Sequence, residues 1–156
     1  MSEEAILVQA KRMALRWLRA RDYSQQEMAA RLRAKGFPEP IVERTLEWLL
    51  QERWLSDERV AQRLAERLEH EQPSGWQRIA QEFERRGLQP PALESDEESR
   101  ALKALQTRFG EPKPPPDERT VARWFRFLLG RGFEPEVARR ALHRWNPFLS
   151  EMSIEE

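Results

Sequence analysis

Three stretches of the chain share one order of apolar and polar positions. Each places apolar residues eight, seven and four positions before a glycine, a spacing that puts them on one face of a helix. A basic residue precedes the glycine, an apolar residue follows it, and a proline comes within four residues. The three turns are Lys35-Gly36-Phe37, Arg86-Gly87-Leu88 and Arg131-Gly132-Phe133, and the apolar triplets are Met28/Ala29/Leu32, Ile79/Ala80/Phe83 and Trp124/Phe125/Leu128.

This order predicts a helix that ends at a left-handed glycine and an apolar residue that packs back onto that helix. It also predicts a new helix that begins behind the proline. One such turn is common in proteins, whereas three in register predict tandem copies of a helical module.

Short polar residues before the apolar stretches predict where the helices begin. A first helix is expected over about residues 5–20, where apolar residues recur at helical spacing, and another from about Asp96 to Arg108. The predicted capping boxes are Ser24/Glu27 and Ser74/Gln77, and the predicted N-caps are Ser56, Asp57 and Asp117.

The fold is predicted to be all-α, because no stretch alternates apolar and polar residues over the length of a strand. We expect an elongated, curved array of tandem three-helix repeats. The middle repeat is shortened, since prolines and an acidic stretch replace its third helix after Gly87. The predicted bounds are 1–53 for repeat 1, 54–95 for repeat 2, 96–146 for repeat 3 with a proline-rich linker at 110–116, and 147–156 for a tail.

The formal net charge of zero hides a segregation of charge along the chain. Residues 10–35 carry eight Lys or Arg against two Asp or Glu, and residues 119–145 carry seven against two. The segments 36–58 and 88–99 each hold four more acidic than basic residues. Only four of the 27 basic residues are lysine, and arginine suits bidentate contacts with phosphate or carboxylate. A polyanionic partner is therefore favoured.

Arginines recur every four residues after Ser56, so they are expected to form an exposed stripe beside a buried apolar face of one helix. Pairing with nearby glutamates on a solvated face is the alternative for any single arginine. The set expected to contact a polyanion or an acidic protein groove is Arg59, Arg63, Arg67, Arg78, Arg85, Arg86, Arg123, Arg126 and Arg131.

Six tryptophans raise the question of base stacking. Most of them lie on the apolar side of a predicted helix, which favours packing in the core. Trp54 and Trp76 lie next to predicted turns, so these two are the candidates for stacking or docking.

The sequence shows none of the residue patterns that catalysis or metal binding requires. It contains no cysteine, and neither His70 nor His143 has a histidine partner four residues away. No glycine-rich nucleotide motif occurs. We therefore expect a protein that binds and does not catalyse, with no catalytic residues, no metal site and no cofactor.

The N-terminal Ser2-Glu3-Glu4 lacks the basic and then apolar pattern of a signal peptide. No apolar run approaches the roughly 18 residues that cross a bilayer. We expect a cytoplasmic protein that does not associate with membranes.

Two segments, from Trp54 to Ala61 and from Ile79 to Leu88, are similar to the central signature of the RecX family, bacterial regulatory proteins that modulate the RecA recombinase. Residues 21–28 resemble the opening motif of the family and residues 125–133 its closing motif, and the likeness covers roughly residues 12–145. The chain departs from the signature in its shortened middle repeat, at Arg53, where the family has glycine, and at Val60, where it has an aromatic residue.

The resemblance implies tandem three-helix repeats that bind RecA and the RecA–ssDNA filament along its groove. It implies inhibition of RecA ATPase, strand-exchange and coprotease activity in DNA repair and the SOS response. The neutral total charge predicts weak, strongly salt-dependent binding to free DNA, and we expect a monomer. The alternatives are a stand-alone DNA-binding regulator of the helix-turn-helix type and a protein–protein scaffold whose arginines are only solvated.

Overall fold

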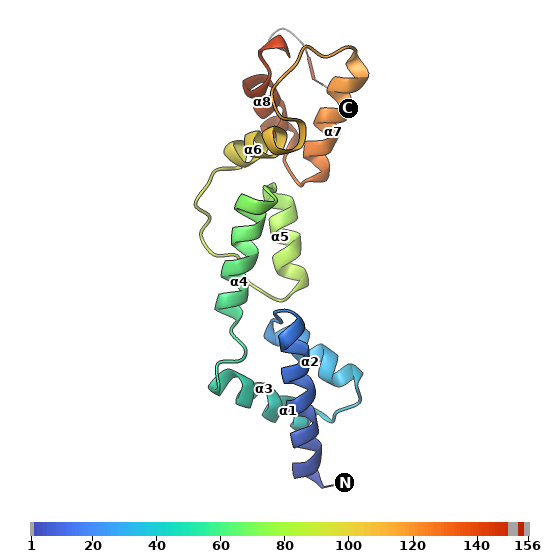
Figure 1. Cartoon of the computed structure of the whole chain (residues 1–156), viewed down its shortest axis with the longest axis vertical. Helices are drawn as coiled ribbons and strands as arrows, with labels where there is room; N and C mark the ends of the chain where they lie inside the picture. The colour runs from blue at the N-terminus through green and yellow to red at the C-terminus, as the bar shows by residue number, and fades with distance from the viewer. Residues whose placement is uncertain (1, 150–152, 155–156) are drawn as a thin grey trace. The chain divides into compact units, whose positions relative to one another are not determined.

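The structure is a computed structural model that describes residues 2–149, 153 and 154. Within that part of the chain all regular elements are helical, which confirms the predicted all-α fold (Figure 1). The α-helices are α1 (Glu3–Ala20), α2 (Gln25–Ala34), α3 (Glu39–Gln51), α4 (Asp57–Glu66), α5 (Trp76–Arg85), α6 (Glu97–Phe109), α7 (Glu118–Gly130) and α8 (Pro135–Trp145). A π-helix, η1 (Arg67–Glu71), continues from α4, and a short 3-10 helix, η2 (Pro147–Leu149), follows α8.

The chain forms two compact units. Unit 1 comprises Met1–Arg63 and Phe83–Gln89, and unit 2 comprises Leu64–Glu82 and Pro90–Glu156. Helices α4 and α5 each contribute residues to both units, so the predicted bounds of three repeats remain a prediction. Of the predicted tail, residues 150–152, 155 and 156 lie outside the described residues.

Unit 1 contains a three-helix module of α1, α2 and α3, which contact one another pairwise (blue to teal in Figure 1). The predicted capping box begins α2: Glu27 N–H donates to Ser24 Oγ at 3.2 Å, and Ser24 N–H donates to Glu27 Oε1 at 2.9 Å. The buried core is Leu7, Ala10, Ala14, Trp17, Tyr23, Met28, Ala29, Leu32, Ile41, Val42, Leu49 and Leu55.

Unit 2 contains a second module, in which α8 contacts both α6 and α7. Its core is aromatic, and the rings of Trp124 and Trp145 meet edge to face with their centroids 5.1 Å apart. The predicted linker at 110–116 is not helical. Two hydrogen bonds hold it to the end of α8, from Trp145 Nε1 to Gly110 O at 3.1 Å and from Asn146 Nδ2 to Lys113 O at 2.9 Å.

The three glycine turns have the same hydrogen bonding, as predicted. Gly36, Gly87 and Gly132 have φ of 92°, 72° and 88°. In each turn the N–H of the apolar residue after glycine donates to the carbonyl five residues before it: Phe37 to Leu32 at 3.3 Å, Leu88 to Phe83 at 2.9 Å and Phe133 to Leu128 at 3.2 Å. This is the Schellman motif, which satisfies carbonyls that the end of a helix leaves free.

Two of these turns are docked against the first residues of another helix. In unit 1, Ser24 Oγ at the start of α2 donates to Arg86 O at 2.6 Å. In unit 2, Gly75 N–H donates to Arg131 O at 2.9 Å and Gln77 N–H to Gly132 O at 3.2 Å, so the third turn meets the start of α5. A Cβ placed on Gly36 in the first turn would meet nothing within 4 Å.

The hydrogen bonds at the starts of α4 and α5 differ from two of the predicted caps. Ser56 does cap α4, since Arg59 N–H donates to its Oγ at 3.1 Å, but the Asp57 carboxylate accepts instead from Gln25 N–H of α2 at 2.8 Å. The predicted capping box of Ser74 and Gln77 is wrong. Ser74 Oγ donates to Gln72 O at 2.7 Å, and the N–H of Gln77 donates to Gly132 O in the docked third turn.

We predict that Gly75→Ala destabilises unit 2 by about 3 kcal/mol, because the new methyl group would collide with the backbone of Gly132. Gly130→Ala is the matched control, since a Cβ at Gly130 meets nothing within 4 Å. Urea unfolding followed by circular dichroism measures both. An unchanged unfolding midpoint for Gly75→Ala would contradict the close approach of the two backbones.

Candidate functional site

The predicted arginine stripe begins on α4. Arg59 and Arg63 are exposed one helical turn apart, while Val60 and Leu64 of the same helix are buried. Arg67, also exposed, is the first residue of η1. The structure therefore confirms an exposed basic face beside a buried apolar one.

Arg59 and Arg63 line a groove of about 620 Å³ in unit 1, which we call the Trp54 groove. Its apolar lining comes from Leu15 and Leu18 of α1 and from Trp54, whose side chain is 51% exposed. The remaining lining residues are Arg19, Asp22 and Arg53.

Four arginines and one carboxylate line the Trp54 groove. Arg63 forms an ion pair with the carboxylate of Asp22, its Nη1 lying 2.6 Å from Asp22 Oδ2. Arg59 makes only a long hydrogen bond, 3.4 Å, to the carbonyl of Trp54. The side chains of Arg19 and Arg53 have no hydrogen-bond or ion-pair partner within the part of the chain that the structure describes. The groove therefore has a surplus of positive charge.

Arg53 reaches this groove from a strained backbone. It lies two residues after the end of α3 and has φ 62°. Trp54 N–H donates to Leu49 O at 2.8 Å, so the turn is a fourth Schellman motif that lacks glycine. A side chain in this left-handed conformation costs about 1 kcal/mol. Neither Arg19 nor Arg53 was in the predicted set. The signal for Arg53 was its place in the signature where the RecX family has glycine.

A second group of arginines lies in unit 2 and consists of Arg78, Arg108 and Arg131, the unit 2 cluster. Burial lowers the pKa of the Arg131 guanidinium, and the like charges of Arg78 and Arg108 lower that pKa further. The Arg131 guanidinium lies over the ring of Phe127, 5.1 Å from its centroid. Among the described residues no carboxylate is within ion-pair distance of these three arginines. Arg108 too was missing from the predicted set.

The remaining predicted arginines are spread over both units. Arg123 and Arg126 are exposed on α7, and neither side chain has a hydrogen-bond or ion-pair partner in the described part of the chain. Arg85 is exposed at the end of α5. These positions agree with a solvent-facing role but do not bring the arginines into one site.

Arg86 differs from the others because its guanidinium has internal partners. Its side chain is 16% exposed; Nη2 lies 3.0 Å from Glu27 Oε1 and donates to Asp22 O at 3.3 Å. Although partial burial alone would raise the pKa of the Glu27 carboxyl, hydrogen bonds from Ser24 and Arg86, with the charges of Arg86 and Arg21, lower it below the ordinary value. Arg86 thus holds the docked turn to α2.

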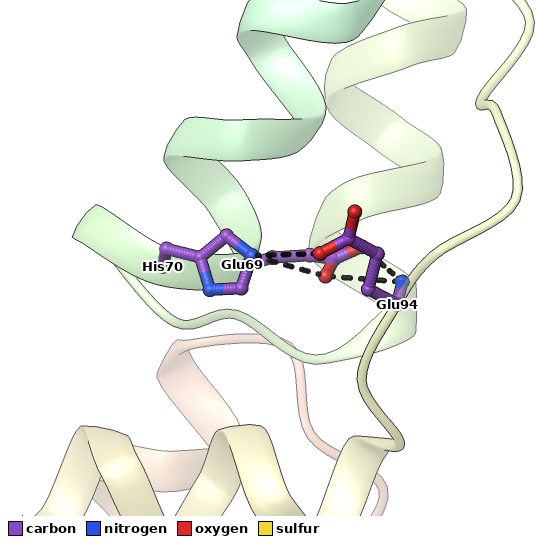
Figure 2. A group of neighbouring side chains, drawn as sticks. All are labelled: Glu69, His70 and Glu94. Atoms are coloured by element: carbon purple, nitrogen blue, oxygen red, sulfur yellow. Dashed lines mark hydrogen bonds and ion pairs between the residues drawn. The ribbon is translucent and has the colours of Figure 1, made fainter.

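The carboxylates of Glu69 and Glu94 lie on one side of the His70 ring, beside its Nε2 atom (Figure 2). His70 Nε2 lies 3.6 Å from Glu69, 3.7 Å from Glu94 and 3.9 Å from Glu66. Sequence spacing could not reveal this group, because Glu94 comes from the segment before α6.

Glu69 in this group has a structural task. Its buried carboxylate accepts from Glu94 N–H at 2.9 Å and from Ser95 Oγ at 3.2 Å. The nearby Arg100, also buried, donates to Ser74 O at 2.8 Å and to Ser95 O at 2.7 Å. The ligand atoms of Glu69, His70 and Glu94 lie within 4.8 Å of one another, a spacing compatible with a bound cation. The hydrogen bonds instead show Glu69 fixing the segment that leads into α6.

The arrangement of the described residues suits binding of an anion through exposed guanidinium groups. The fold and the site together define an all-helical protein of tandem three-helix domains with arginine-rich surfaces. The RecX first three-helix domain matches residues 10–49, and the RecX third three-helix domain matches residues 96–142. None of the described helices is long and apolar enough to cross a membrane.

Relatives matched over most of their own length agree with these domain matches. Regulatory protein RecX of Herbaspirillum seropedicae is 33% identical over 141 residues, which cover 86% of this chain and 89% of the relative. Regulatory protein RecX of Chromohalobacter salexigens is 37% identical over 140 residues, covering 85% and 90%. The chain therefore belongs to the RecX family, whose members are named as regulatory proteins.

The fold agrees with a solved member. The crystal structure of RecX from Lactobacillus salivarius superposes with a TM-score of 0.68 at 14% identity, covering 91% of this chain and 97% of that one. This likeness supports the tandem helical repeats.

We predict that the ion pair of Glu27 and Arg86 contributes to stability at neutral pH and loses this contribution in acid. The pKa of Glu27 is lower in the folded chain than its usual value of about 4.3, so the folded state gains stability above that pH. This gain disappears as the pH falls through the folded pKa.

Glu27→Gln should therefore lower the free energy of unfolding at pH 7 by about 1 kcal/mol, with the difference from wild type vanishing in acid. Urea unfolding at a series of pH values measures this. Glu84→Gln is the control, because Glu84 is exposed and has no side-chain partner in the described part. A deficit of Glu27→Gln that persists unchanged in acid would contradict the assignment.

Proposed function

We propose that this protein regulates RecA by binding the RecA–ssDNA filament and inhibiting its ATPase, recombinase and coprotease activities. Membership of the RecX family supports a regulatory role, and the resemblance of its motifs supports RecA as the target. In this proposal the protein acts in the cytoplasm, as a monomer, and does no chemistry of its own.

The observation that carries the proposal is the unit 2 cluster. Arg78 and Arg108 each repel Arg131, and among the described residues no carboxylate lies within ion-pair distance of the three to offset that repulsion. A phosphate or an acidic protein surface would relieve it, because each guanidinium can form a charge-assisted and bidentate hydrogen bond. The exposed arginines proposed to extend this contact are Arg59, Arg63, Arg67, Arg85, Arg123 and Arg126. Arg86, from the predicted set, would contribute only if it left its internal partners.

The neutral total charge limits how this contact can work. Acidic surface elsewhere on the chain weakens attraction to bare DNA, so a filament that presents both protein and nucleic acid suits the chain better. Free DNA is accordingly proposed to bind weakly and with strong salt dependence.

We predict that Arg78→Gln/Arg108→Gln needs about tenfold more protein than wild type for half-maximal inhibition of RecA ATP hydrolysis on single-stranded DNA. The reason is the loss of two charge-assisted contacts. The measurement is a titration of each variant into preformed filaments, with strand exchange as a second readout.

Arg140→Gln/Arg144→Gln is the matched control, because it removes the same charge from the same unit. Arg140 and Arg144 already have a carboxylate, with Nε and Nη1 at 3.2 and 2.8 Å from the oxygens of Glu98. Equal losses for the two double variants would show that only net charge matters and would contradict the proposal. A wild-type protein that does not change RecA activity would also contradict the proposal.

The alternative of a stand-alone DNA-binding regulator requires a preferred duplex sequence. Helices α2 and α3, joined at the Gly36 turn, are the pair that would serve it. A selection from random-sequence duplex that enriches one motif would favour that function, whereas binding without sequence preference favours the filament.

A further inference from the structure

We propose that the Trp54 groove is a binding site for one nucleotide of a single-stranded nucleic acid. In this site the base stacks on the Trp54 indole, and the flanking phosphates contact Arg53, Arg19 and Arg59. The inference deepens the proposed function, on which it rests for its biological role. The site itself is testable without RecA.

Trp54 has an indole that is open for stacking. Among the tryptophans that the structure describes, only Trp54 and Trp76 are exposed, at 51% and 46%. The Trp54 ring has no aromatic or cationic partner within the described residues, whereas Trp17 and Trp48 stack against Arg31 and Lys11. Stacking of a base on such a ring is tolerant of sequence and contributes about 1–3 kcal/mol.

The charges around Trp54 distinguish it from Trp76. Arginine side chains line the groove beside Trp54, and its single carboxylate, Asp22, is already paired with Arg63. Trp76, by contrast, lies at a carboxylate, because its backbone N–H donates to Glu97 Oε1 at 3.1 Å. The lining of the Trp54 groove therefore favours stacking of a nucleic-acid base on Trp54, whereas the Glu97 carboxylate disfavours stacking on Trp76.

Arg53 supplies an independent argument. Its left-handed backbone is a conformation that glycine adopts without strain, yet the position carries a long cation. The side chain has no hydrogen-bond or ion-pair partner in the described part, so no contact within the molecule offsets that strain. Strained residues of this kind occur at ligand sites, where the ligand provides the missing contact.

The combination favours a nucleotide over an acidic peptide. The groove combines an exposed indole, two leucines and four guanidinium groups against the single carboxylate of Asp22. This lining matches a ligand that is planar and aromatic on one side and carries one negative charge at regular intervals on the other. The groove volume of about 620 Å³ lies in the range of small-ligand sites. The experiment below distinguishes a nucleotide from an acidic peptide of a protein partner.

The experiment measures binding of a fluorescein-labelled oligodeoxythymidylate of about ten nucleotides by anisotropy, at low salt and without RecA. Trp54→Ala should weaken binding about tenfold, Trp54→Phe should retain most of the affinity, and Trp76→Ala should bind as wild type. An oligomer of abasic sites should bind wild type and Trp54→Ala equally, because it has no base to stack.

Arg53→Gly separates a binding role from a structural one. It removes the cation and also the backbone strain, so the melting temperature should equal or exceed that of wild type while oligonucleotide binding weakens about threefold or more. The slope of log K against log salt should become shallower by about 0.7. A variant that melts earlier and binds normally would overturn the assignment of Arg53.

The proposal is wrong if Trp54→Ala binds the oligonucleotide as well as wild type, or if Trp76→Ala weakens binding equally. It is also wrong if wild type does not bind the oligonucleotide at low salt. Groove variants that bind the oligonucleotide normally but bind RecA filaments poorly would assign the groove to a protein partner.

The failure of this site and the failure of the proposed function give different results. A wild-type protein that inhibits RecA but does not bind the oligonucleotide refutes the nucleotide site and leaves regulation of RecA intact. A protein that binds the oligonucleotide through Trp54 but does not affect RecA refutes the proposed function and retains the site.

Discussion

A glycine turn docked on the first residues of a helix recurs in both units, and the positions of the helices depend on it. The start of a helix has N–H groups without partners, and the end of the preceding helix has free carbonyls. N–H groups of the Schellman turn donate to carbonyls in the last turn of its own helix. The carbonyls of the turn itself, those of Arg86, Arg131 and Gly132, then accept hydrogen bonds from residues at the start of another helix. Gly75 and Gly132 bring the two backbones so close that neither position has room for a side chain.

This arrangement separates the polar groups that build the fold from those that are free to bind. Arg86, Glu27, Glu69 and Arg100 satisfy one another or the backbone. Around Trp54 and in the unit 2 cluster, guanidinium groups outnumber the carboxylates that could neutralise them. An uncompensated charge costs stability, so its retention on two surfaces points to ligands that supply the opposite charge.

The sequence predicted what local periodicity determines and missed what distant segments bring together. The three glycine turns, the box at Ser24 and the cap at Asp117 follow from spacing within one segment. The bond from Ser24 to Arg86 joins residues 62 positions apart, so no local pattern revealed that Arg86 has internal partners. For the same reason the sequence did not reveal the contact of Gln77 with Gly132, so the predicted capping box at Ser74 was wrong. Nor did it reveal that Arg19 lies in the same groove as Trp54.

The central claim is that surface arginines, foremost those of the unit 2 cluster, bind a polyanion presented by the RecA filament. Its most direct test is the affinity of the wild-type chain for RecA–ssDNA filaments as a function of salt between about 50 and 200 mM. If several guanidinium groups replace counterions, log K should fall with log salt with a slope of about −3 or steeper. An affinity that stays constant over this range would contradict the claim, because hydrophobic or neutral contacts would then dominate the interface.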